Sequence, residues 1–325
     1  SRGLGDVYKR QGVRFTDDKG NFYFGRNLDW CEEYGQGFVI TPTGAKIPSP
    51  YLGTMPLKHP VIGVAIVVDN TPLYLDCANN AGLGVAGLNF PGYAHFADEP
   101  IDETTNIAVY EFPLWLCANF GSIAEVKEAL KDVTLVAKPI NDTYPVAMLH
   151  WLVCDKEGSL VVEATKDGIE VYDDELDVLT NQPGYPWHRE NVRNYLALSN
   201  SYPDKPLTWS RADLVPFSSG SMMLGLPGAF DPISRFVRAA YLNAHYPTKS
   251  GETANVMRLF HTLGGVAMCE GGSRMSNNQF EYTLYSDCYS MATGTYYYKS
   301  YDDFTINQCC INDYDVAGDE VIVCK

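Results

Sequence analysis

Residues 12–30 read GVRFTDDKGNFYFGRNLDW, and they predict a β-hairpin at the start of the fold. The runs VRF and NFYFGRNLDW are rich in aromatic and β-branched residues, and the cluster Asp17–Gly20 between them is typical of a turn. Arg26 and Asp29 stand three residues apart, so they face opposite sides of an ideal strand. If they share a site, we expect a bulge or a strand end near Asn27. A surface ion pair is the alternative.

The rest of the chain alternates groups of strand-like and helical segments. Strand patterns cover 37–41, 60–90, 148–180 and 280–310, and helical patterns cover 106–130 with a break at Gly121, 189–198, 231–245 and 253–263. Hairpins dominate this order, which predicts antiparallel sheets covered by helices and not a repeated βαβ unit. No repeat or linker divides the chain, so we expect one domain over residues 12–325. We expect residues 1–11 to be a non-native, adapter-derived segment.

Composition excludes several classes of partner. The chain has 325 residues and a net charge of −16, which argues against a nucleic-acid partner. The longest apolar run, Val61–Val68, is too short to span a bilayer, so we expect no membrane partner. The nine cysteines form no CxxC motif and suggest reduced thiols in a cytoplasmic protein. The six histidines lie far apart, so we expect no metal site. We also expect no cofactor.

Three further motifs raise the choice between a structural and a functional interpretation. Residues 82–87, GLGVAG, match GxGxxG, but the following LNFPG excludes the helix that a dinucleotide site needs. Asn181 ends a strand and is either a turn former or a fixed amide donor. Arg235 opposes the dipole of its predicted helix, so either it has an anionic partner at a site or it is exposed and pairs with Asp231. No GxSxG occurs, and we interpret the histidines at 150 and 188 as structural.

Five features together resemble the choloylglycine hydrolase family of bile salt hydrolases and penicillin V acylases. They are FGRNLDW at 24–30, NNAGLGVAGLNFPGY at 79–93, VLTNQPGYPWH at 178–188, LPGAFDPISRFVRAA at 226–240 and the strands of the C-terminal meander. The resemblance covers nearly the whole chain. It implies an α+β fold, the four-layer αββα sandwich of two antiparallel sheets found in N-terminal nucleophile hydrolases.

The resemblance also identifies what this chain lacks. In the family, removal of the initiator methionine exposes a cysteine that is the nucleophile, and its own α-amine carries the proton. Counting back from FGRNLDW places that cysteine at position 10, where this chain has Arg10. We therefore expect the chain as it stands to be inactive.

The remaining site residues follow from the resemblance position by position. Arg26 would stabilise the thiolate, Asp29 would orient the α-amine, and Asn89 would donate to the oxyanion. Asn181 would be a second polar residue near the nucleophile, and Arg235 the distal arginine of the site. Leu28 and Ile140 would line an apolar steroid pocket.

The same resemblance implies a substrate and an assembly. Asn89 in LNFPGY is similar to bile salt hydrolases, whereas penicillin-preferring relatives tend to carry tyrosine there. We therefore expect an amide hydrolase of glycine- or taurine-conjugated bile acids, without a cofactor, as a homotetramer in the cytoplasm of a gut bacterium. Penicillin V acylase is one alternative. A catalytically dead member that binds amphipathic acids is the other.

Overall fold

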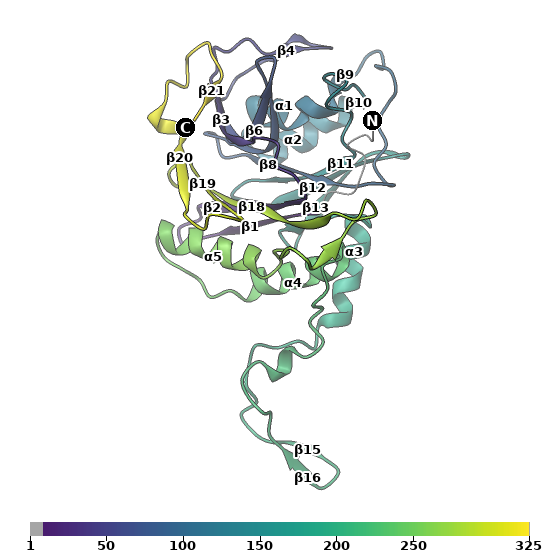
Figure 1. Ribbon diagram of the computed structural model, residues 1–325, viewed down its shortest axis with the longest axis vertical. Helices are drawn as coiled ribbons and strands as arrows, with labels where there is room; N and C mark the ends of the chain where they lie inside the picture. The colour runs from purple at the N-terminus through teal and green to yellow at the C-terminus, as the bar shows by residue number, and fades with distance from the viewer. Residues whose placement is uncertain (1–8, 325) are drawn as a thin grey trace.

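The protein, for which we obtained a computed structural model, is described here for residues 9–324 and, for side chains, 10–324. Two large antiparallel sheets are stacked, with helices on both outer faces (Figure 1). This is the predicted αββα sandwich. Of the segment 1–11 that we expected to be non-native, residues 1–8 lie outside the described part, and residues 9–11 continue the first strand.

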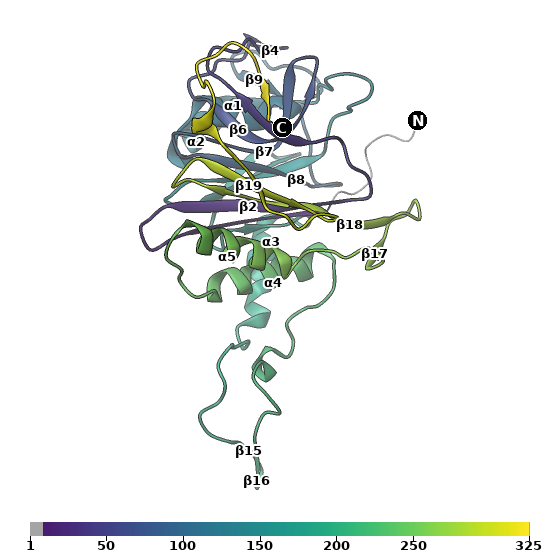
Figure 2. The same cartoon turned by 60° about the vertical axis from the view of Figure 1, so that its left-hand side comes forward.

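The first sheet holds both strands of the predicted hairpin. Its order is β14 (Val178–Leu179), β1 (Lys9–Thr16), β2 (Phe22–Trp30), β18 (Phe280–Ser290), β19 (Thr295–Ser300) and β20 (Asn307–Cys310), with β17 (Ser273–Arg274) paired to β18. On its outer face lie α3 (Tyr185–Val192), α4 (Pro232–His245) and α5 (Glu252–Gly264), as Figure 2 shows.

The second sheet lies above the first in Figure 2 and contains the apolar central strands. Its order is β13 (Gly168–Asp174), β12 (Ser159–Thr165), β11 (Leu149–Cys154), β8 (Gly84–Asn89), β7 (Thr71–Asn79), β6 (Val61–Val68), β3 (Gly37–Thr41) and β21 (Ile322–Val323). Its outer face is covered by α1 (Phe112–Asn119) and α2 (Ile123–Ala129).

Short elements complete the chain. Three small pairs are β4 (Pro48–Ser49) with β5 (Gly53–Thr54), β9 (Thr105–Ala108) with β10 (Val133–Val136), and β15 (Leu207–Trp209) with β16 (Ala212–Leu214). Single 3-10 turns lie at Val109–Glu111, Leu130–Asp132, Arg193–Tyr195, Ser221–Met223 and Ile311–Asp313.

Strand β2 is buried along its whole length because one face meets the second sheet and the other meets α5 and the side chain of Arg235 in α4. Burial on both faces explains why its sequence shows no alternation of polar and apolar residues. Gly25 belongs to this strand, and a Cβ there would collide with the backbone carbonyl of Asp287 in β18. Glycine therefore lets the two strands approach each other immediately beside Arg26.

Two predicted helices begin elsewhere. The helix predicted over 106–130 is wrong at its start, because residues 105–108 form β9, which pairs in parallel with β10. Its helical part begins where Pro113 occupies the first turn, and the predicted break near Gly121 is confirmed. The helix predicted at 189–198 instead begins at Tyr185, where Pro186 again lies in the first turn, and it ends at Val192. The helices at 232–245 and 252–264 match the predicted positions.

A long arm, which contains β15 and β16, projects away from the two sheets (Figures 1 and 2). It leaves the body after α3 and returns before α4. In the described residues, 9–324, no helix is long and apolar enough to cross a membrane.

Candidate active site

The side chain of Asn181 connects three separate elements around residue 10. Its Oδ1 accepts a hydrogen bond from the backbone N–H of Arg10 in β1 at 3.0 Å and another from Nη2 of Arg235 in α4 at 2.8 Å. Its Nδ2 donates to the backbone carbonyl of Asn89, at the end of β8, at 2.7 Å. The predicted residues Asn181, Arg235 and Asn89 are thus gathered at the position expected for the nucleophile.

Arg235 is completely buried in the first turns of α4. Its guanidinium donates to the carbonyls of Phe230 at 2.9 Å and Arg10 at 3.2 Å, and its Nη1 lies 3.9 Å from Oδ2 of Asp29. The alternative of an exposed arginine paired with Asp231 is excluded, because Asp231 caps the helix instead. A buried cation at a helix N-terminus is unfavourable unless anions and carbonyls compensate it, and here they do.

Arg26 and Asp29 leave opposite faces of β2, and the expected bulge near Asn27 is absent from this strand. Strand β2 pairs with β1 in unbroken register, and the only shift lies in the partner β18, between Thr283 and Tyr285. The guanidinium of Arg26 points to the second sheet, where it donates to the carbonyl of Gly87 at 2.8 Å. The carboxylate of Asp29 accepts from Thr283 at 2.6 Å and faces Arg235.

Residue 10 lies between these two charged groups. Its side chain lies on the Arg26 face, because the guanidinium of Arg10 donates to the same Gly87 carbonyl at 2.9 Å. Its backbone N–H and carbonyl face Asn181 and Arg235. A side chain and an α-amine at position 10 would therefore contact different residues. The side chain would lie beside Arg26, and the α-amine would lie beside the group around Asn181.

Two buried aspartates lie behind Arg26. Oδ2 of Asp76 is 3.8 Å from Nε of Arg26 and accepts from the hydroxyl of Tyr285 at 3.2 Å. Oδ1 of Asp287 accepts from the backbone N–H of Arg26 at 2.8 Å, and the two carboxyls are hydrogen-bonded to each other. Burial and the charge of Asp76 raise the pKa of Asp287 well above its ordinary value. Burial also raises the pKa of Asp76, but the guanidinium of Arg26 opposes this shift, so Asp76 is the better placed of the two to carry the charge that faces Arg26.

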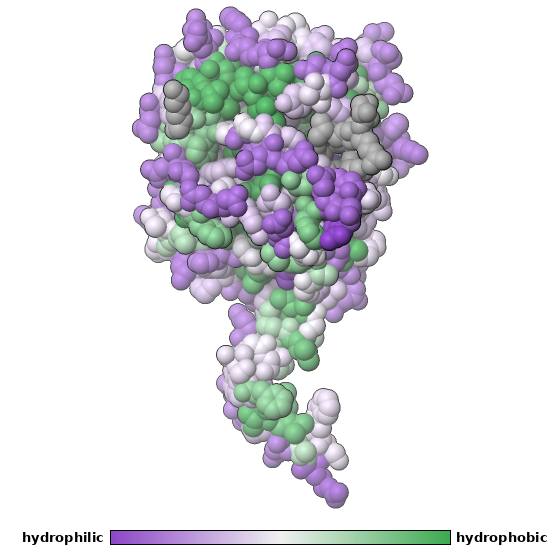
Figure 3. Space-filling model, viewed as in Figure 1, coloured by the Kyte–Doolittle hydropathy of each residue, from purple (hydrophilic) through white to green (hydrophobic). Residues whose placement is uncertain are grey.

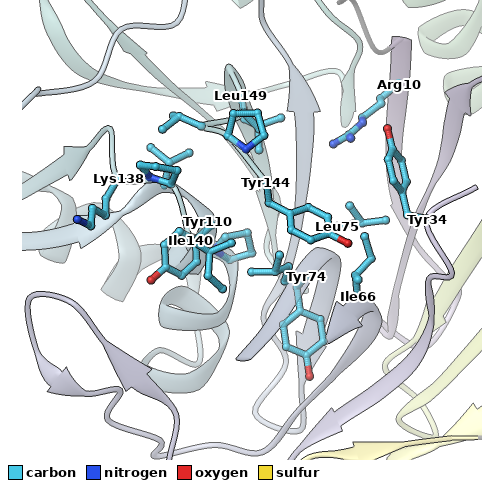
Figure 4. Close-up of a pocket in the computed structure, with 17 residues that line it drawn as sticks. Arg10, Tyr34, Ile66, Tyr74, Leu75, Tyr110, Lys138, Ile140, Tyr144 and Leu149 are labelled. Atoms are coloured by element: carbon cyan, nitrogen blue, oxygen red, sulfur yellow. The ribbon is translucent and has the colours of Figure 1, made fainter. Parts of the chain in front are cut away.

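An apolar pocket opens beside residue 10 (Figure 4). Arg10 lies at one side of the view and Lys138 at the other, with Tyr110, Ile140 and Tyr144 between them. The lining residues are Arg10, Tyr34, Ile66, Leu73, Tyr74, Leu75, Val109, Tyr110, Pro113, Lys138, Pro139, Ile140, Tyr144, Pro145, Val146, Ala147 and Leu149. No cysteine is among them, and burial raises the thiol pKa of cysteines in the sheets such as Cys77 and Cys154.

Of the two residues expected to line a pocket, the structure places only Ile140 there. Leu28 is fully buried in the hydrophobic core and is not in contact with the pocket. The alternation of β2 turns Leu28 to the same side as Arg26, between the two sheets, where neighbouring side chains enclose it.

Comparison with known sequences identifies the family. The profile described as linear amide C-N hydrolases, choloylglycine hydrolase family, matches residues 11–324. The chain belongs to the choloylglycine hydrolase family. It is 48% identical over 312 residues to a bile salt hydrolase/transferase of Bifidobacterium longum, covering 96% of this chain and 98% of that protein. It is 46% identical to a conjugated bile acid hydrolase of Lactobacillus gasseri, with the same coverage of both proteins.

Solved structures agree with this assignment. The crystal structure of a cysteine-to-alanine mutant of the conjugated bile acid hydrolase from Clostridium perfringens superimposes with a TM-score of 0.91 at 35% identity, covering 97% of this chain and 96% of that chain. Penicillin V acylase from Agrobacterium tumefaciens shares the fold, with a TM-score of 0.74 at 16% identity, over 96% of this chain and 90% of that chain.

Two histidines support the loop that carries Asn181. His188 in α3 bonds the backbone carbonyl of Asn181 through Nε2 at 3.0 Å, and burial lowers its pKa to about 4, so its ring is neutral. His150 in β11 bonds the carbonyl of Thr180 at 2.9 Å and the carboxylate of Glu163 at 3.2 Å. Their predicted structural role agrees with these contacts. Among residues 9–324, no group of three or more His, Cys, Asp or Glu side chains could hold a metal ion.

Sequence reasoning missed Asp76 and Asp287. Each lies in a segment that reads as a buried strand, LYLDCAN in β7 and LYSDCYS in β18, and each is fully buried. A carboxylate inside an apolar strand pattern is the signal that could have identified them, because such a group is rarely buried without a partner.

Replacing both aspartates with asparagine should destabilise the protein far more than replacing Asp287 alone. In Asp287→Asn the amide can still accept from Arg26 and donate to Asp76, so we expect a change within about 1 kcal/mol at pH 7. In the double variant Asp76→Asn/Asp287→Asn the buried guanidinium of Arg26 loses its carboxylate, which costs about 3–5 kcal/mol. Urea unfolding measures both values. Equal stabilities of the single and double variants would contradict the ion pair.

The same single variant has a defined pH dependence. Protonated Asp287 stabilises the folded chain below the unfolded pKa of about 3.9, and this contribution is lost as the pH rises through its raised folded pKa. Asparagine does not titrate. The stability of Asp287→Asn should therefore fall less steeply than that of the parent as the pH rises above about 4.

Proposed function

We propose that this fold, with a cysteine at position 10 as its N-terminal residue, hydrolyses the amide bond of glycine- or taurine-conjugated bile acids. We further propose that the chain with Arg10 is inactive, because it offers neither a thiol nor a free α-amine at that position. One observation carries both proposals. The backbone N–H of Arg10 lies against Oδ1 of Asn181, while its side chain lies beside Arg26 at the pocket.

The geometry supports a different role in the reaction for each of the residues around position 10. The guanidinium of Arg26 would stabilise a thiolate on its face of β1. Asn181 and Asp29 would hold the α-amine, which takes the thiol proton and later gives it to the leaving amine. The amide of Asn89 would donate to the oxyanion of the tetrahedral intermediate. The thioester that forms would then be hydrolysed by water, which restores the thiol.

The pocket supports an amphipathic substrate. Its walls are mainly aliphatic and aromatic side chains, and its charged residues, Arg10 and Lys138, lie at opposite sides (Figure 4). A rigid steroid would occupy the apolar walls with its amide at residue 10, and its anionic tail would remain toward solvent. The names of the two bacterial relatives, a bile salt hydrolase/transferase and a conjugated bile acid hydrolase, favour this substrate.

A chain in which Met-Cys replaces residues 1–10 should release glycine from glycocholate or taurine from taurocholate, and the chain as it stands should not. Amino-acid release is measured with ninhydrin. The matched control is Arg10→Cys in the full chain, which has the thiol but no free α-amine. It should remain inactive, because the thiol lacks its proton acceptor.

Other outcomes separate the alternatives. Cleavage of penicillin V in preference to both bile salts would identify a penicillin V acylase instead. A correctly folded Met-Cys chain that cleaves neither class of amide would contradict the proposed enzyme.

The chain with Arg10 has a second candidate function, the binding of an amphipathic carboxylate. The observation that favours it is the guanidinium of Arg10 at one side of the apolar pocket. Calorimetry should show binding of free cholate to this chain and a loss of roughly tenfold or more in Arg10→Ala, because a charge-assisted hydrogen bond is removed. Lys19→Ala, which removes a distant exposed cation, is the control and should bind as the parent does. Equal affinity in all three would exclude this function.

We also propose that the catalytic domain, residues 12–325, assembles as a homotetramer in the bacterial cytoplasm. The arm between α3 and α4 supports assembly, because it carries exposed apolar side chains, including Trp209 at 76% and Leu224 at 92% exposure. Figure 3 shows green, hydrophobic patches on this arm. Contiguous apolar surface of this kind is typical of protein interfaces. The unpaired, mainly buried cysteines fit a reducing compartment.

The arm gives a direct test of assembly. Light scattering should give the mass of a tetramer for the parent chain and a smaller mass for Trp209→Glu/Leu224→Glu, because burying charges without partners opposes association. Ser219→Glu, a change at an exposed polar position of the same arm, should keep the parent mass. A monomeric parent chain would contradict the proposed tetramer.

A further inference from the structure

Two cysteines at the far edge of the sandwich lie in contact. Cys309 is near the end of β20, and Cys324 follows β21 near the end of the chain. The thiol of Cys309 donates to the sulfur of Cys324 across 2.9 Å. The two sulfurs are thus within about an ångström of the roughly 2.05 Å of a disulfide bond. Only a small side-chain movement separates the thiol pair from a covalent bond.

The two cysteines belong to different sheets. Strand β20 is the outermost strand of the first sheet, and β21 is the outermost strand of the second. Cys324 is held at the second sheet because its backbone N–H donates to the carbonyl of Phe38 at 2.9 Å. A bond between the two sulfurs would therefore fasten the two sheets at one side of the molecule. The catalytic group around Asn181 lies elsewhere, so this inference is independent of the proposed function.

The neighbouring cysteine is placed differently. The Sγ of Cys310 points toward the carbonyl of Thr293 at 3.4 Å, because successive residues of β20 face opposite sides. In residues 9–324 the Cys309 and Cys324 pair is not part of any group of three or more metal-ligating side chains. The chemistry available to these two sulfurs is therefore oxidation to a disulfide, and not metal binding.

The two thiols have different roles in such a reaction. The hydrogen bond from Cys309, together with one from the hydroxyl of Tyr314, lowers the pKa of Cys324 to about 7. The same contact with Cys324 raises the pKa of Cys309. Cys324 is partly exposed, whereas Cys309 is 5% exposed. Cys324 is thus the thiolate that reacts first with an external oxidant, and Cys309 is the thiol that reacts second.

We propose that Cys309 and Cys324 form a reversible disulfide that joins the two sheets, with a low-molecular-weight disulfide as the oxidant. The thiolate of Cys324 attacks one sulfur of the oxidant, forms a mixed disulfide and releases one thiolate. Cys309 then loses its proton and attacks Sγ of Cys324, which forms the protein disulfide and releases the second thiolate. The two protein thiols lose two electrons and two protons, and the oxidant is reduced to two thiols.

The test uses the full chain and oxidised glutathione. After incubation, free thiols are blocked with N-ethylmaleimide and the intact protein is weighed without reduction. We expect Cys309 and Cys324 to be the two of the nine thiols that are lost together without carrying glutathione, whereas the exposed, solitary Cys269 can only take up glutathione. Non-reducing peptide maps should join the peptide containing Cys309 to the C-terminal peptide. Dithiothreitol should restore both thiols.

Variants distinguish this bond from its neighbours. Cys310→Ser is the matched control and should form the same link as the parent. Cys309→Ser should instead keep glutathione on Cys324, because the second thiol is missing. A parent chain that shows no link, or a link that is lost in Cys310→Ser and kept in Cys309→Ser, would overturn the proposal.

Stability supplies a second measurement. The link closes a loop between residues 309 and 324 and fastens the last strand, so oxidation should raise the melting temperature by about 3 °C or more. The increase should occur in the parent and in Cys310→Ser, and be absent in Cys309→Ser. A melting temperature that falls when the link forms would contradict the proposal that this disulfide fastens the two sheets together.

Discussion

The whole site depends on one buried amide, the side chain of Asn181. It satisfies a donor in β1, an acceptor in β8 and a donor in α4, three elements that are distant in sequence. A buried amide with good partners on both atoms is fixed in one orientation, since any rotation would leave buried groups unpaired. The backbone of residue 10 is therefore fixed relative to both sheets. The neutral ring of His188 stacks on Phe236, with the ring centroids 4.4 Å apart, and its bond to the backbone carbonyl of Asn181 fixes the loop.

Strand β2 then separates two charged systems. On one face Arg26 meets Asp76 and Asp287, between the two sheets, and on the other Asp29 meets Arg235, beneath α4. Each system contains a buried cation with a carboxylate, which is tolerable only when hydrogen bonds complete the pairing. Because the strand lies between them, the charge near a side chain at position 10 and the charge near its backbone can be set independently.

The features of the fold and the site that could be predicted are those whose sequence signals lie close together in the chain. The hairpin and the cap of α4 by Asp231 are local, and the sequence indicates both through turn and capping residues. The spacing of the family motifs directed attention to position 10, and the backbone N–H of that residue donates to Asn181. Simple strand alternation places Arg26 and Asp29 on opposite faces of β2. The expectation that the two residues share a site required a bulge or strand end near Asn27, and β2 has no bulge there. The electrostatic coupling between Asp76 and Asp287 joins β7 to β18, and no local pattern in the sequence indicates such a pairing.

Arg10 also changes the charge around position 10. The guanidinium groups of Arg10 and Arg26 donate to the same carbonyl, that of Gly87, at 2.9 and 2.8 Å. Two cations in one low-dielectric site repel each other, so both must be held by hydrogen bonds. An N-terminal cysteine would instead bring a thiolate toward Arg26 and an ammonium toward Asp29, with no net charge. The proposed N-terminal cysteine would thus match the charges of Arg26 and Asp29, whereas the guanidinium of Arg10 adds a second cation beside Arg26.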